Sequence, residues 1–509
     1  MTNPPRGLAA AVISAVALVV GAGTSYDAVA RASVFRVSVT RQPASRPIKP
    51  GFLGLALEYR SIPALTGTTP KTVNPVLVGL IRNLVGNGRP VLRIGGQSGD
   101  RTWWPIAGMR RPIGITYDLT PRWMASAHAL AQAAGARLIL GVGLEANRPR
   151  IDAVEAGQLL KGLGRRYIDA LEIGNEPELY PLIPWFLNLH GKAVPWYSHF
   201  GVPVYSRRTT YGPGAFAQEF SRTLQVLPRI PIAGPDTGIV SWLGGFRGFV
   251  GPGSRVRILT WHAYGLNQCV MVASSPLYPT VSNLLRPQAS RAVVNGISPY
   301  VALAHRFGAS FRVDEMNSVT CNGRLGVSNT FASALWVMDS LFTIASRGVD
   351  GVNIHTFQNA ANGLFDFHRS RGHWQGTVHP LYYGVLMFAR AAPPGSRVLR
   401  IHAANQSQIR VWATIGADHR VRVLLINTST GRSTQTLVRA PGRSGSVVRL
   451  RASSAYATGR VTLGGQRFAP RTESGALAPP RTEVANARGG AYSVRLPAAS
   501  AALLTIPAD

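Results

Sequence analysis

Short apolar runs alternate with helix-like stretches from residue 51 to about residue 390. The runs are apolar on both faces, which is typical of parallel strands buried between two layers. Eight of them are strand candidates, at residues 51–58, 90–95, 137–143, 169–174, 230–234, 257–262, 310–315 and 351–355. Six stretches with helical periodicity lie between them, at residues 72–86, 121–134, 154–163, 216–227, 293–306 and 329–346. This alternation predicts an α/β fold, a (β/α)₈ TIM barrel with inserted loops.

The weak point of this count is the connection between the fifth and sixth strands. It is a short, glycine-rich segment through Trp242 rather than a long helix. A doubly wound open sheet is the alternative fold. That sheet would be expected to carry a Gly-x-Gly-x-x-Gly fingerprint after its first strand, and the sequence has none there. The barrel is therefore the favoured fold.

The pattern changes after about residue 393. Apolar runs become short, often alternate with polar residues and are separated by Gly, Ser, Thr and Pro, which predicts a C-terminal antiparallel β-sandwich. These runs lie at residues 409–415, 421–427, 435–438, 447–450, 460–463 and 493–496. Residues 33–41 alternate in the same way although they precede the barrel. We expect that strand to cross over and pair with the sandwich.

The first thirty residues resemble a targeting segment. Arg6 precedes an apolar stretch at residues 8–23, and Ala28-Val29-Ala30 supplies small residues at the spacing that a signal peptidase prefers. No second run approaches the roughly 20 apolar residues of a membrane span. The predicted organisation is a signal peptide or membrane anchor at 1–30, an N-terminal strand segment at 33–50, a catalytic barrel at 51–392 and a β-sandwich at 393–509. The folded part is expected to be secreted or associated with the cell envelope.

The charge is strongly positive. The chain has 54 Lys and Arg against 22 Asp and Glu, a net charge of +32. The arginines are dispersed, which favours a composition bias over a dedicated basic element, although attraction to an acidic polysaccharide would follow from the same charge. A nucleic-acid partner is not expected, because no binding module or interleaved basic and aromatic stripe is present.

Acidic residues are scarce, yet they gather at the ends of the predicted strands. The carboxyl ends of barrel strands are where this fold builds its active site. The acids at or just after strand ends are Glu58, Asp100, Glu145, Glu176, Glu178, Asp236, Asp314 and Glu315. Clustered carboxylates in a basic protein indicate a functional site.

Glu176 and Glu315 are the strongest candidates for catalysis. Glu176 ends the fourth strand in Gly174-Asn175-Glu176-Pro177, and Glu315 ends the seventh. Two carboxyl groups that face each other across a barrel mouth can carry out glycoside hydrolysis, because one donates a proton to the leaving oxygen and the other attacks the anomeric carbon. Their separation decides between retention and inversion of configuration, and the sequence does not give it.

Three segments resemble glycoside hydrolase family 79, the β-glucuronidases and heparanase-like enzymes. They are Gly174-Asn175-Glu176-Pro177, Trp261-His262-Ala263-Tyr264 and Glu315-Met316-Asn317-Ser318, and residues 326–336 fit as well. The resemblance covers about residues 51–509. It implies that Glu176 is the acid/base and Glu315 the nucleophile, that configuration is retained, and that the substrate is a glycan or glucuronide with β-linked glucuronic acid or a related uronic acid.

Further residues are expected to bind the sugar. Asn175 is placed to bond the 2-hydroxyl, and Tyr264 to hold the nucleophile or contact the sugar. Glu58 and Asp100 resemble the family's acceptors for sugar hydroxyls, and the glycines before Gln97 let the backbone approach the ring. In the family, the loop after the nucleophile and tyrosine hydroxyls bind the glucuronate carboxylate. The candidates in that loop are Asn322, Gly323 and Arg324, but the loop contains no tyrosine.

Cys269 and Cys321 follow neighbouring strands and are a candidate disulfide, with two free thiols as the alternative. We expect neither a metal nor another cofactor, because His262, His355 and His379 are too scattered along the chain for a metal site. Two other functions stay open. They are another retaining barrel glycosidase, such as a xylosidase or arabinofuranosidase, and a non-catalytic protein that binds acidic glycans. The sequence does not indicate an oligomeric state.

Overall fold

The computed structural model describes residues 34–507, apart from 87, 196–199 and 404–407. The expected signal peptide or anchor at residues 1–30 lies outside the described residues. Within the described part of the chain, no helix combines the length and the apolar character needed to cross a membrane.

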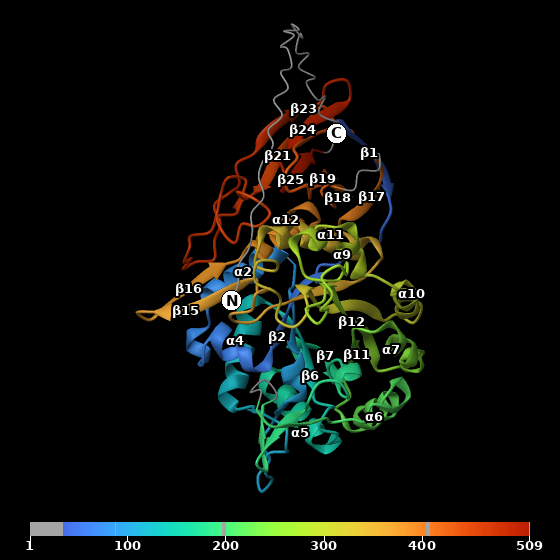
Figure 1. Ribbon diagram of the computed structural model, residues 1–509, viewed down its shortest axis with the longest axis vertical. Coiled ribbons are helices and arrows are strands. Elements are labelled where there is room, and N and C mark those ends of the chain that lie inside the picture. Colours follow the sequence, from blue (N-terminus) through green and yellow to red (C-terminus); the bar gives the residue numbers. More distant parts are fainter. Residues whose placement is uncertain (1–33, 87, 196–199, 404–407, 508–509) are drawn as a thin grey trace, which may run out of the picture. The chain divides into compact units, whose positions relative to one another are not determined.

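Eight parallel strands close into a barrel in chain order, as predicted. They are β2 (Leu53–Glu58), β3 (Val91–Gly95), β6 (Arg137–Val142), β7 (Ile168–Ile173), β11 (Ile232–Thr237), β12 (Val256–Leu266), β13 (Ser310–Val319) and β14 (Gly351–His355). Helices surround the barrel (Figure 1). The principal ones are α2 (Pro75–Val85), α4 (Pro121–Ala134), α5 (Pro149–Leu163), α6 (Pro213–Val226), α10 (Ser298–Arg306), α11 (Phe331–Ser346) and α12 (Pro380–Ala391). The TIM-barrel prediction is confirmed.

The ends of two helices follow directly from the local sequence. At the start of α2 the Asn74 side chain accepts hydrogen bonds from the backbone N–H groups of Val76 and Leu77, and Pro75 occupies the first turn. Thr120 caps α4 in the same way, and Gly135 ends it in the left-handed conformation at φ +65°. These signals explain why the predicted boundaries of α4 match the structure.

Several predicted boundaries were wrong. The helix expected at 293–306 begins only at Ser298, because Gly296 at φ +74° interrupts the chain after α9 (Pro287–Ala292). The short connection through Trp242 contains α7 (Val240–Gly245). The sequence analysis also missed a hairpin of β15 (Phe365–Ser370) and β16 (His373–Val378), which is inserted after the last barrel strand.

The C-terminal part is a β-sandwich, as predicted, built on a ten-stranded sheet. Its strands are β1 (Val34–Pro43), β17 (Arg397–Ala403), β18 (Ile409–Ile415), β19 (Val421–Asn427), β20 (Thr434–Arg439), β21 (Ser444–Arg451), β22 (Thr462–Leu463), β23 (Glu483–Asn486), β24 (Ala491–Leu496) and β25 (Ser500–Ile506). The sheet folds over a separate apolar core that includes Phe35, Val423, Tyr492 and Leu504. β17, β23 and β25 were missed from the sequence.

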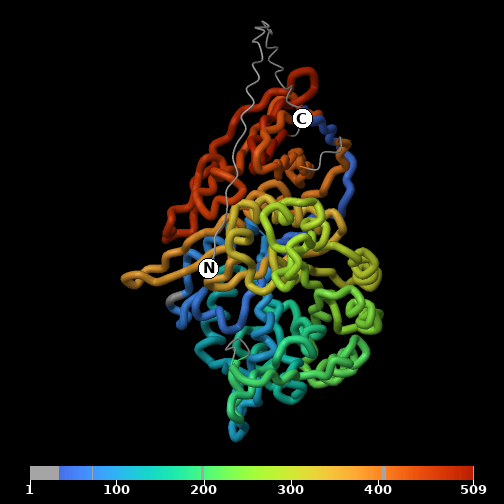
Figure 2. Tube along the Cα trace, in the orientation of Figure 1, coloured from blue at the N-terminus to red at the C-terminus, as the bar shows by residue number. Residues whose placement is uncertain are grey.

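β1 joins this sheet although it precedes the barrel in sequence. It pairs antiparallel with β17 and parallel with β20. Figures 1 and 2 show this blue segment beside the orange β17. Phe35 and Val37 alternate into the sandwich core, while the residues between them face outward.

The sandwich packs directly on α11 of the barrel. α11 is buried from Phe331 to Ala345, which is unusual for a helix on the outside of a barrel. On its outer side the Trp412 ring stacks on Phe342 at 5.5 Å between centroids, and its indole N–H donates to Asp339 at 2.8 Å. α11 is therefore buried on all sides because it lies between the barrel and the β-sandwich.

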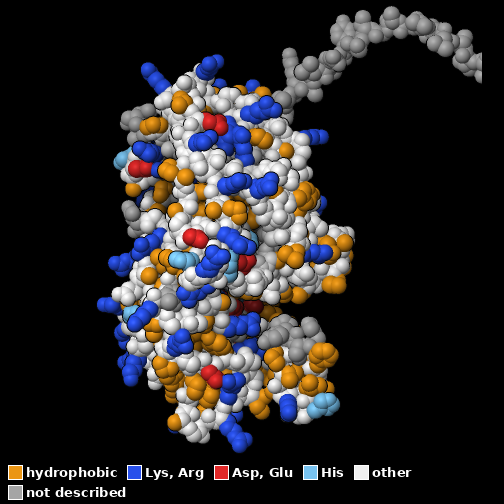
Figure 3. All heavy atoms as spheres, turned by 90° about the vertical axis from the view of Figure 1, so that its left-hand side faces the viewer, with side chains coloured by type: hydrophobic (Ala, Val, Ile, Leu, Met, Phe, Trp, Pro, Cys, Tyr) orange, Lys and Arg blue, Asp and Glu red, His pale blue; other side chains and the backbone are white. Residues whose placement is uncertain are grey.

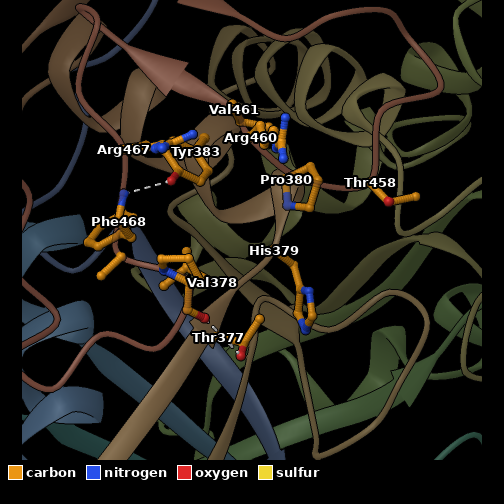
Figure 4. A pocket seen from close by; sticks show the side chains of 13 residues that line it. Thr377, Val378, His379, Pro380, Tyr383, Thr458, Arg460, Val461, Arg467 and Phe468 are labelled. Carbon is orange, nitrogen blue, oxygen red and sulfur yellow. Dashed lines mark hydrogen bonds between the residues drawn. The ribbon is translucent and has the colours of Figure 1, made fainter.

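A second junction lies at α12. The backbone N–H of Phe468 donates to the Tyr383 hydroxyl at 2.9 Å, which is the upper dashed line in Figure 4. Between this loop and the start of α12 lies a cavity of about 550 Å³, and His379 and Arg460 line it. His379 bonds Asp366 of the β15–β16 hairpin at 2.8 Å.

The loops that carry the two cysteines lie side by side. Cys269 follows β12 and Cys321 follows β13, and their Sγ atoms are 3.6 Å apart. Both are exposed free thiols in this structure. The Cys321 residue is exposed, but partial desolvation of its sulfur and the neighbouring Cys269 raise its pKa to about 11, which disfavours the reactive thiolate. A disulfide between them stays a prediction.

The positive charge is widely distributed over the surface. On the face shown in Figure 3, Lys and Arg side chains occur from one end to the other, and few acidic side chains are visible. Most of the acids named in the sequence analysis are instead buried inside the barrel.

Two of the scarce acids lie on the buried side of α5 rather than at a strand end. Asp152 and Glu155 are 4% and 0% exposed. Neither oxygen of Glu155 has a hydrogen-bond partner among the described residues. Burial, followed by the charges of Asp152 and Asp100, raises the pKa of Glu155 well above its usual value. The folded protein therefore favours the neutral carboxyl form.

Replacing Glu155 with Gln should flatten part of the pH dependence of stability. A carboxyl group with a raised folded-state pKa binds its proton more tightly in the folded chain, so stability falls as pH rises above the unfolded pKa. Glu155→Gln should thus gain on the order of 1 kcal/mol over the wild type at pH 8 and little at pH 4. Urea unfolding across this range measures the difference, with the exposed Glu473→Gln as control. Parallel curves for wild type and Glu155→Gln would contradict the assignment.

Candidate active site

Glu176 and Glu315 lie together at the carboxyl end of the barrel. Glu315 belongs to β13, and Glu176 follows β7. One carboxylate oxygen of each lies within 4.8 Å of the other and of a ring nitrogen of His262. The side chain of Glu176 is 25% exposed and that of Glu315 only 7%. The two glutamates therefore share one site, with Glu176 nearer to solvent.

The backbone after β7 turns sharply to present Glu176. Gly174 and Glu176 have φ angles of +77° and +44°. A non-glycine residue in this region is strained by roughly 1–2 kcal/mol and is held there by its surroundings. Here the Glu176 N–H donates to the carbonyl of Asp236 at 2.8 Å, and Pro177 starts a short 3₁₀ helix. The sequence Gly-Asn-Glu-Pro thus encodes the turn that ends the strand.

Three donors surround Glu315. Arg93 Nη1 lies 2.6 Å from Oε2, the Tyr264 hydroxyl donates to Oε1 at 2.6 Å, and His355 Nδ1 lies 3.4 Å from Oε1. Burial alone would raise the pKa of Glu315, but the charges of His355, His262 and Arg93 and the Tyr264 bond hold it well below its usual value. Glu315 is therefore ionised.

Arg93 is the centre of this network. Its guanidinium is completely buried and forms ion pairs with Glu172 at 2.7 Å, Asp236 at 2.6 Å and Glu315 at 2.6 Å. Nη2 also donates to Oδ1 of Asn175 at 2.9 Å. Arg93 was not predicted from the sequence. The available signal was a charged residue in the middle of an otherwise apolar strand, Val91–Gly95.

His262 connects Glu176 to the same network. Nδ1 bonds Oε1 of Glu176 at 2.9 Å, and Nε2 bonds Oδ1 of Asp236 at 2.6 Å. Burial lowers the pKa of His262, but the charges of Asp236 and Glu315 outweigh burial and raise it well above its usual value. His262 is therefore an imidazolium that donates from both nitrogens.

The remaining buried acids divide into charged and neutral groups. Arg93 and His262 hold the pKa of Asp236 below its usual value against the effect of burial. Burial and the charges of Glu172 and Asp236 raise the pKa of Asp314 well above its usual value. Glu172 and Asp314 interact directly, so a proton between them satisfies both carboxyl groups. Asp314 thus lies deep in the barrel as a neutral partner.

Among the described residues, two sets of side chains have the spacing of metal ligands. They are Glu176, His262 and Glu315, and Asp236, His262 and Asp314. His262 belongs to both, but a histidine ligand needs a nitrogen without a proton. Because both nitrogens of His262 face carboxylates and its pKa is raised, the arrangement fits a proton-bearing imidazolium better than a metal ligand.

The histidines are less scattered than the sequence suggested. His262 and His355 are far apart in the sequence, but both lie near Glu315 in the fold, at 4.0 and 3.4 Å. They come from β12 and β14, which flank β13 in the barrel. His379 is separate and bonds Asp366.

Four other residues predicted to bind the sugar also lie at the carboxyl end of the barrel. They are Glu58, Gln97, Asn175 and Tyr264. Oε2 of Glu58 accepts the Ser98 N–H at 2.9 Å, and Oε1 lies 3.3 Å from His355 Nε2. A Cβ at Gly96 would lie 2.2 Å from Oε1 of Glu58, so glycine is required there. Gln97 begins α3 (Gln97–Asp100) and is half-buried. Their roles as sugar contacts stay predictions.

Asp100 differs from its predicted role. It is 2% exposed, and protein donors occupy both of its oxygens. Oδ1 accepts the backbone N–H groups of Leu144 and Glu145, and Oδ2 accepts those of Asn175 and the Tyr180 hydroxyl. Burial raises its pKa to about 6. Asp100 therefore positions the ends of β6 and β7 and is not a contact for the sugar.

The loop after β13 stands apart from the Arg93 network. Arg324 lies over the ring of Tyr278 at 4.9 Å and donates to its hydroxyl at 3.3 Å. Asn322 is exposed, and Gly323 at φ +81° packs against Asn362. A phenol thus lies beside this loop, although it comes from the segment after β12. In the described part of the chain, none of the three loop residues bonds Glu176 or Glu315.

Known proteins resemble this chain in sequence and in fold. Residues 411–503 match the model for the glycosyl hydrolase family 79 C-terminal beta domain. A β-glucuronidase of Neurospora crassa is 22% identical over 78% of this chain and 76% of its own length. Heparanase-2 of Mus musculus, described as inactive, is 25% identical over 56% of this chain and 44% of its own length. The chain therefore spans less than half the length of this relative.

Solved structures support the same fold. A 4-O-α-L-rhamnosyl-β-D-glucuronidase from Fusarium oxysporum aligns over 92% of this chain and 100% of its own, with a TM-score of 0.68 and 19% identity. An arabinofuranosidase from Xanthomonas axonopodis aligns over 92% and 99%, with a TM-score of 0.64 and 14% identity. At such identities the likeness establishes the fold alone. Together with the sequence matches, these findings confirm that the chain resembles glycoside hydrolase family 79, the family of β-glucuronidases and heparanase-like enzymes.

Proposed function

We propose that the protein is a retaining glycoside hydrolase that removes β-linked glucuronic acid, or a related uronic acid, from a glycan or glucuronide. The observation that carries the proposal is the pair of glutamates at the barrel mouth, with oxygens within 4.8 Å of each other. Retaining enzymes hold their carboxyl groups about 5–5.5 Å apart, whereas inverting enzymes leave roughly 6.5–9.5 Å for a water molecule. The observed proximity favours direct attack by a carboxylate.

In the first step, the ionised Glu315 attacks the anomeric carbon as the bond to the leaving oxygen breaks. Glu176 gives its proton to that oxygen, and the product is a glycosyl ester on Glu315. The described hydrogen bond of the Glu176 side chain uses Oε1, which accepts from His262. Oε2 is therefore available to hold the transferred proton.

In the second step, Glu176 is a carboxylate and takes a proton from water. The water oxygen attacks the anomeric carbon, and the sugar leaves Glu315 with its original configuration. Glu315 then regains its negative charge. Arg93, His355 and His262 stabilise that charge, so they favour Glu315 as a leaving group in this step.

The proposed sugar rests on the relatives and on the local charge. The Neurospora relative is a β-glucuronidase, and the Fusarium structure is a glucuronidase. A uronate carboxylate requires donors, and Asn322, Gly323 and Arg324 are the candidates in the loop after Glu315. Arg324 bonds Tyr278, which would bring a phenol as well as a guanidinium to a carboxylate bound there.

The site of action is a further part of the proposal. Arg6, the apolar residues 8–23 and the small residues before Arg31 support a signal peptide or an anchor. The protein would then act outside the cytoplasmic membrane, where extracellular glycans are accessible.

Variants of the two glutamates should behave differently. Glu315→Gln should lose at least about 10⁴-fold in kcat, because an amide cannot form the glycosyl ester. Glu176→Ala should form the ester from an aryl glycoside with a good leaving group and then stall, because it lacks the base. Azide needs no base and should rescue this variant, giving a glycosyl azide with the configuration of the substrate.

The exposed Glu483→Gln serves as the control and should keep wild-type activity. Near-wild-type turnover in either site variant would contradict the assignment. Rescue of Glu176→Ala to the opposite anomer would show that the two roles are exchanged.

A panel of aryl glycosides tests the sugar. The β-glucuronide should be hydrolysed with at least about tenfold higher kcat/KM than the β-glucoside, β-xyloside or α-arabinofuranoside, because a paired carboxylate contact is worth roughly 1.5–3 kcal/mol. Initial rates of aryl release measure the preference. A preference for the arabinofuranoside or the xyloside would replace the uronate assignment, and turnover of none would favour a non-catalytic glycan-binding protein.

A further inference from the structure

Two adjoining hollows form a groove between the barrel and the β-sandwich. The first has a volume of about 860 Å³ and the second about 1000 Å³, and both are lined by Ser298 and Arg347. The groove runs along α10, the end of α11 and β17, which are labelled in Figure 1. It also runs along the segment that follows β1. Its arginines are Arg46, Arg306, Arg347, Arg397 and Arg400 in the first hollow, with Arg291 and Arg410 added in the second. The second hollow is also lined by Asp339, which pairs with Arg410 at 3.5 Å.

This groove lies at the end of the barrel opposite the glutamates. Arg46 precedes β2, Arg306 ends α10 just before β13, and Arg347 follows α11 just before β14. Segments that lead into barrel strands lie at the amino ends of those strands, whereas Glu176 and Glu315 lie at the carboxyl ends of their strands. The groove is therefore a separate site and not an extension of the candidate active site.

The concentration of arginine in the first hollow exceeds what the composition supplies. Five of its fifteen lining residues are arginines, whereas Lys and Arg together are 54 of 509 residues in the chain. No acidic residue lines this hollow among those described. The nearby Asp350 is bonded by Lys49 at 2.7 Å and by His305 at 2.8 Å.

Six of these arginines, all except Arg410, have no ion-pair partner within the described residues. Among them Arg46, Arg347, Arg397 and Arg400 line the first hollow and are exposed, and none of their guanidinium groups forms a salt bridge with a described carboxylate. Elsewhere the protein does pair arginines with acids, as in Arg207 with Glu219 at 2.9 Å. The groove thus presents several unneutralised guanidinium groups in a concave surface.

We propose that this groove binds a linear acidic polysaccharide that carries carboxylate or sulfate groups. Guanidinium groups bind both anions through paired, charge-assisted hydrogen bonds. Two hollows that adjoin at Ser298 and Arg347 fit an extended chain with repeated anions better than a single small ion. The choice of a polysaccharide as the polyanion rests on the proposed function. The positive charge of the groove is independent of that function.

Other polyanions fit the groove less well. Unpaired nucleic acids are usually held by aromatic side chains on which bases stack. The first hollow is lined by none, and the two aromatic residues of the second are packed elsewhere, Phe35 in the sandwich core and Trp412 on Phe342. An anionic membrane is a broad surface that favours protruding basic and aromatic side chains over a concave groove. An acidic glycan held at the amino end of the barrel would keep the protein on its polymer while the opposite end acts on chain termini.

The test compares two sets of four substitutions that remove the same charge. The groove set changes Arg46, Arg347, Arg397 and Arg400 to Ser. The matched control set changes four exposed arginines outside the groove that form no described ion pair, namely Arg110, Arg222, Arg439 and Arg488. Fluorescent heparin and polygalacturonate are the probes, and together they separate sulfate from carboxylate recognition.

The groove set should weaken heparin binding at least about tenfold at 0.1 M salt and flatten the dependence of log Kd on log salt, because fewer counterions are released. The control set should lose no more than about threefold, since it changes only the general field. Both sets should keep the wild-type Tm and the wild-type rate on a small aryl glucuronide. Failure of all proteins to hydrolyse that substrate would contradict the proposed function and leave the binding result intact.

Equal losses in the two sets would overturn the proposal, because composition bias would then explain the binding. Wild-type affinity of the groove set for both polysaccharides, with loss confined to duplex DNA or to vesicles containing anionic lipid, would also overturn it in favour of that other partner.

Discussion

The guanidinium of Arg93 lies wholly inside the barrel and pairs with carboxylates from three other strands, on Glu172, Asp236 and Glu315. A buried cation is costly unless it is fully paired, and removing it would leave buried anions without compensation, at a cost of about 3–5 kcal/mol. The barrel must therefore bring these strands into one register to satisfy Arg93. The same requirement fixes the position of Glu315, so stability of the core and geometry of the site depend on one ion.

Arg93 also decides where the protons reside. Asp236 and Glu315, which both pair with Arg93, are ionised, whereas Asp314 behind them is neutral. Neighbouring carboxylates cannot all ionise in a buried site, so this division is expected from their charges alone. It provides an ionised nucleophile beside Glu176, which the proposed double displacement requires.

Periodicity predicted all eight barrel strands, because buried parallel strands are apolar on both faces. It missed the β15–β16 hairpin and β25, and it overextended α10, whose start depends on Gly296. For the site, strand-end position and the family motifs found Glu176 and Glu315. They did not find Arg93, because one arginine within an apolar strand gives no sign of its partners. They misread Asp100, whose four bonds come from residues that meet only in the folded chain.

In the proposed double displacement, Glu315 is held ionised by Arg93 and its neighbours and becomes covalently attached to the sugar. Incubation with 2-deoxy-2-fluoro-β-glucuronyl fluoride tests this attachment most directly. The fluorine at position 2 slows both steps, but the good fluoride leaving group restores the first, so the glycosyl ester accumulates. Mass spectrometry of the intact and digested protein should show one added fluorosugar, located on the peptide that contains Glu315. A label on Glu176, or steady turnover of glucuronides with no label at Glu315, would contradict the account.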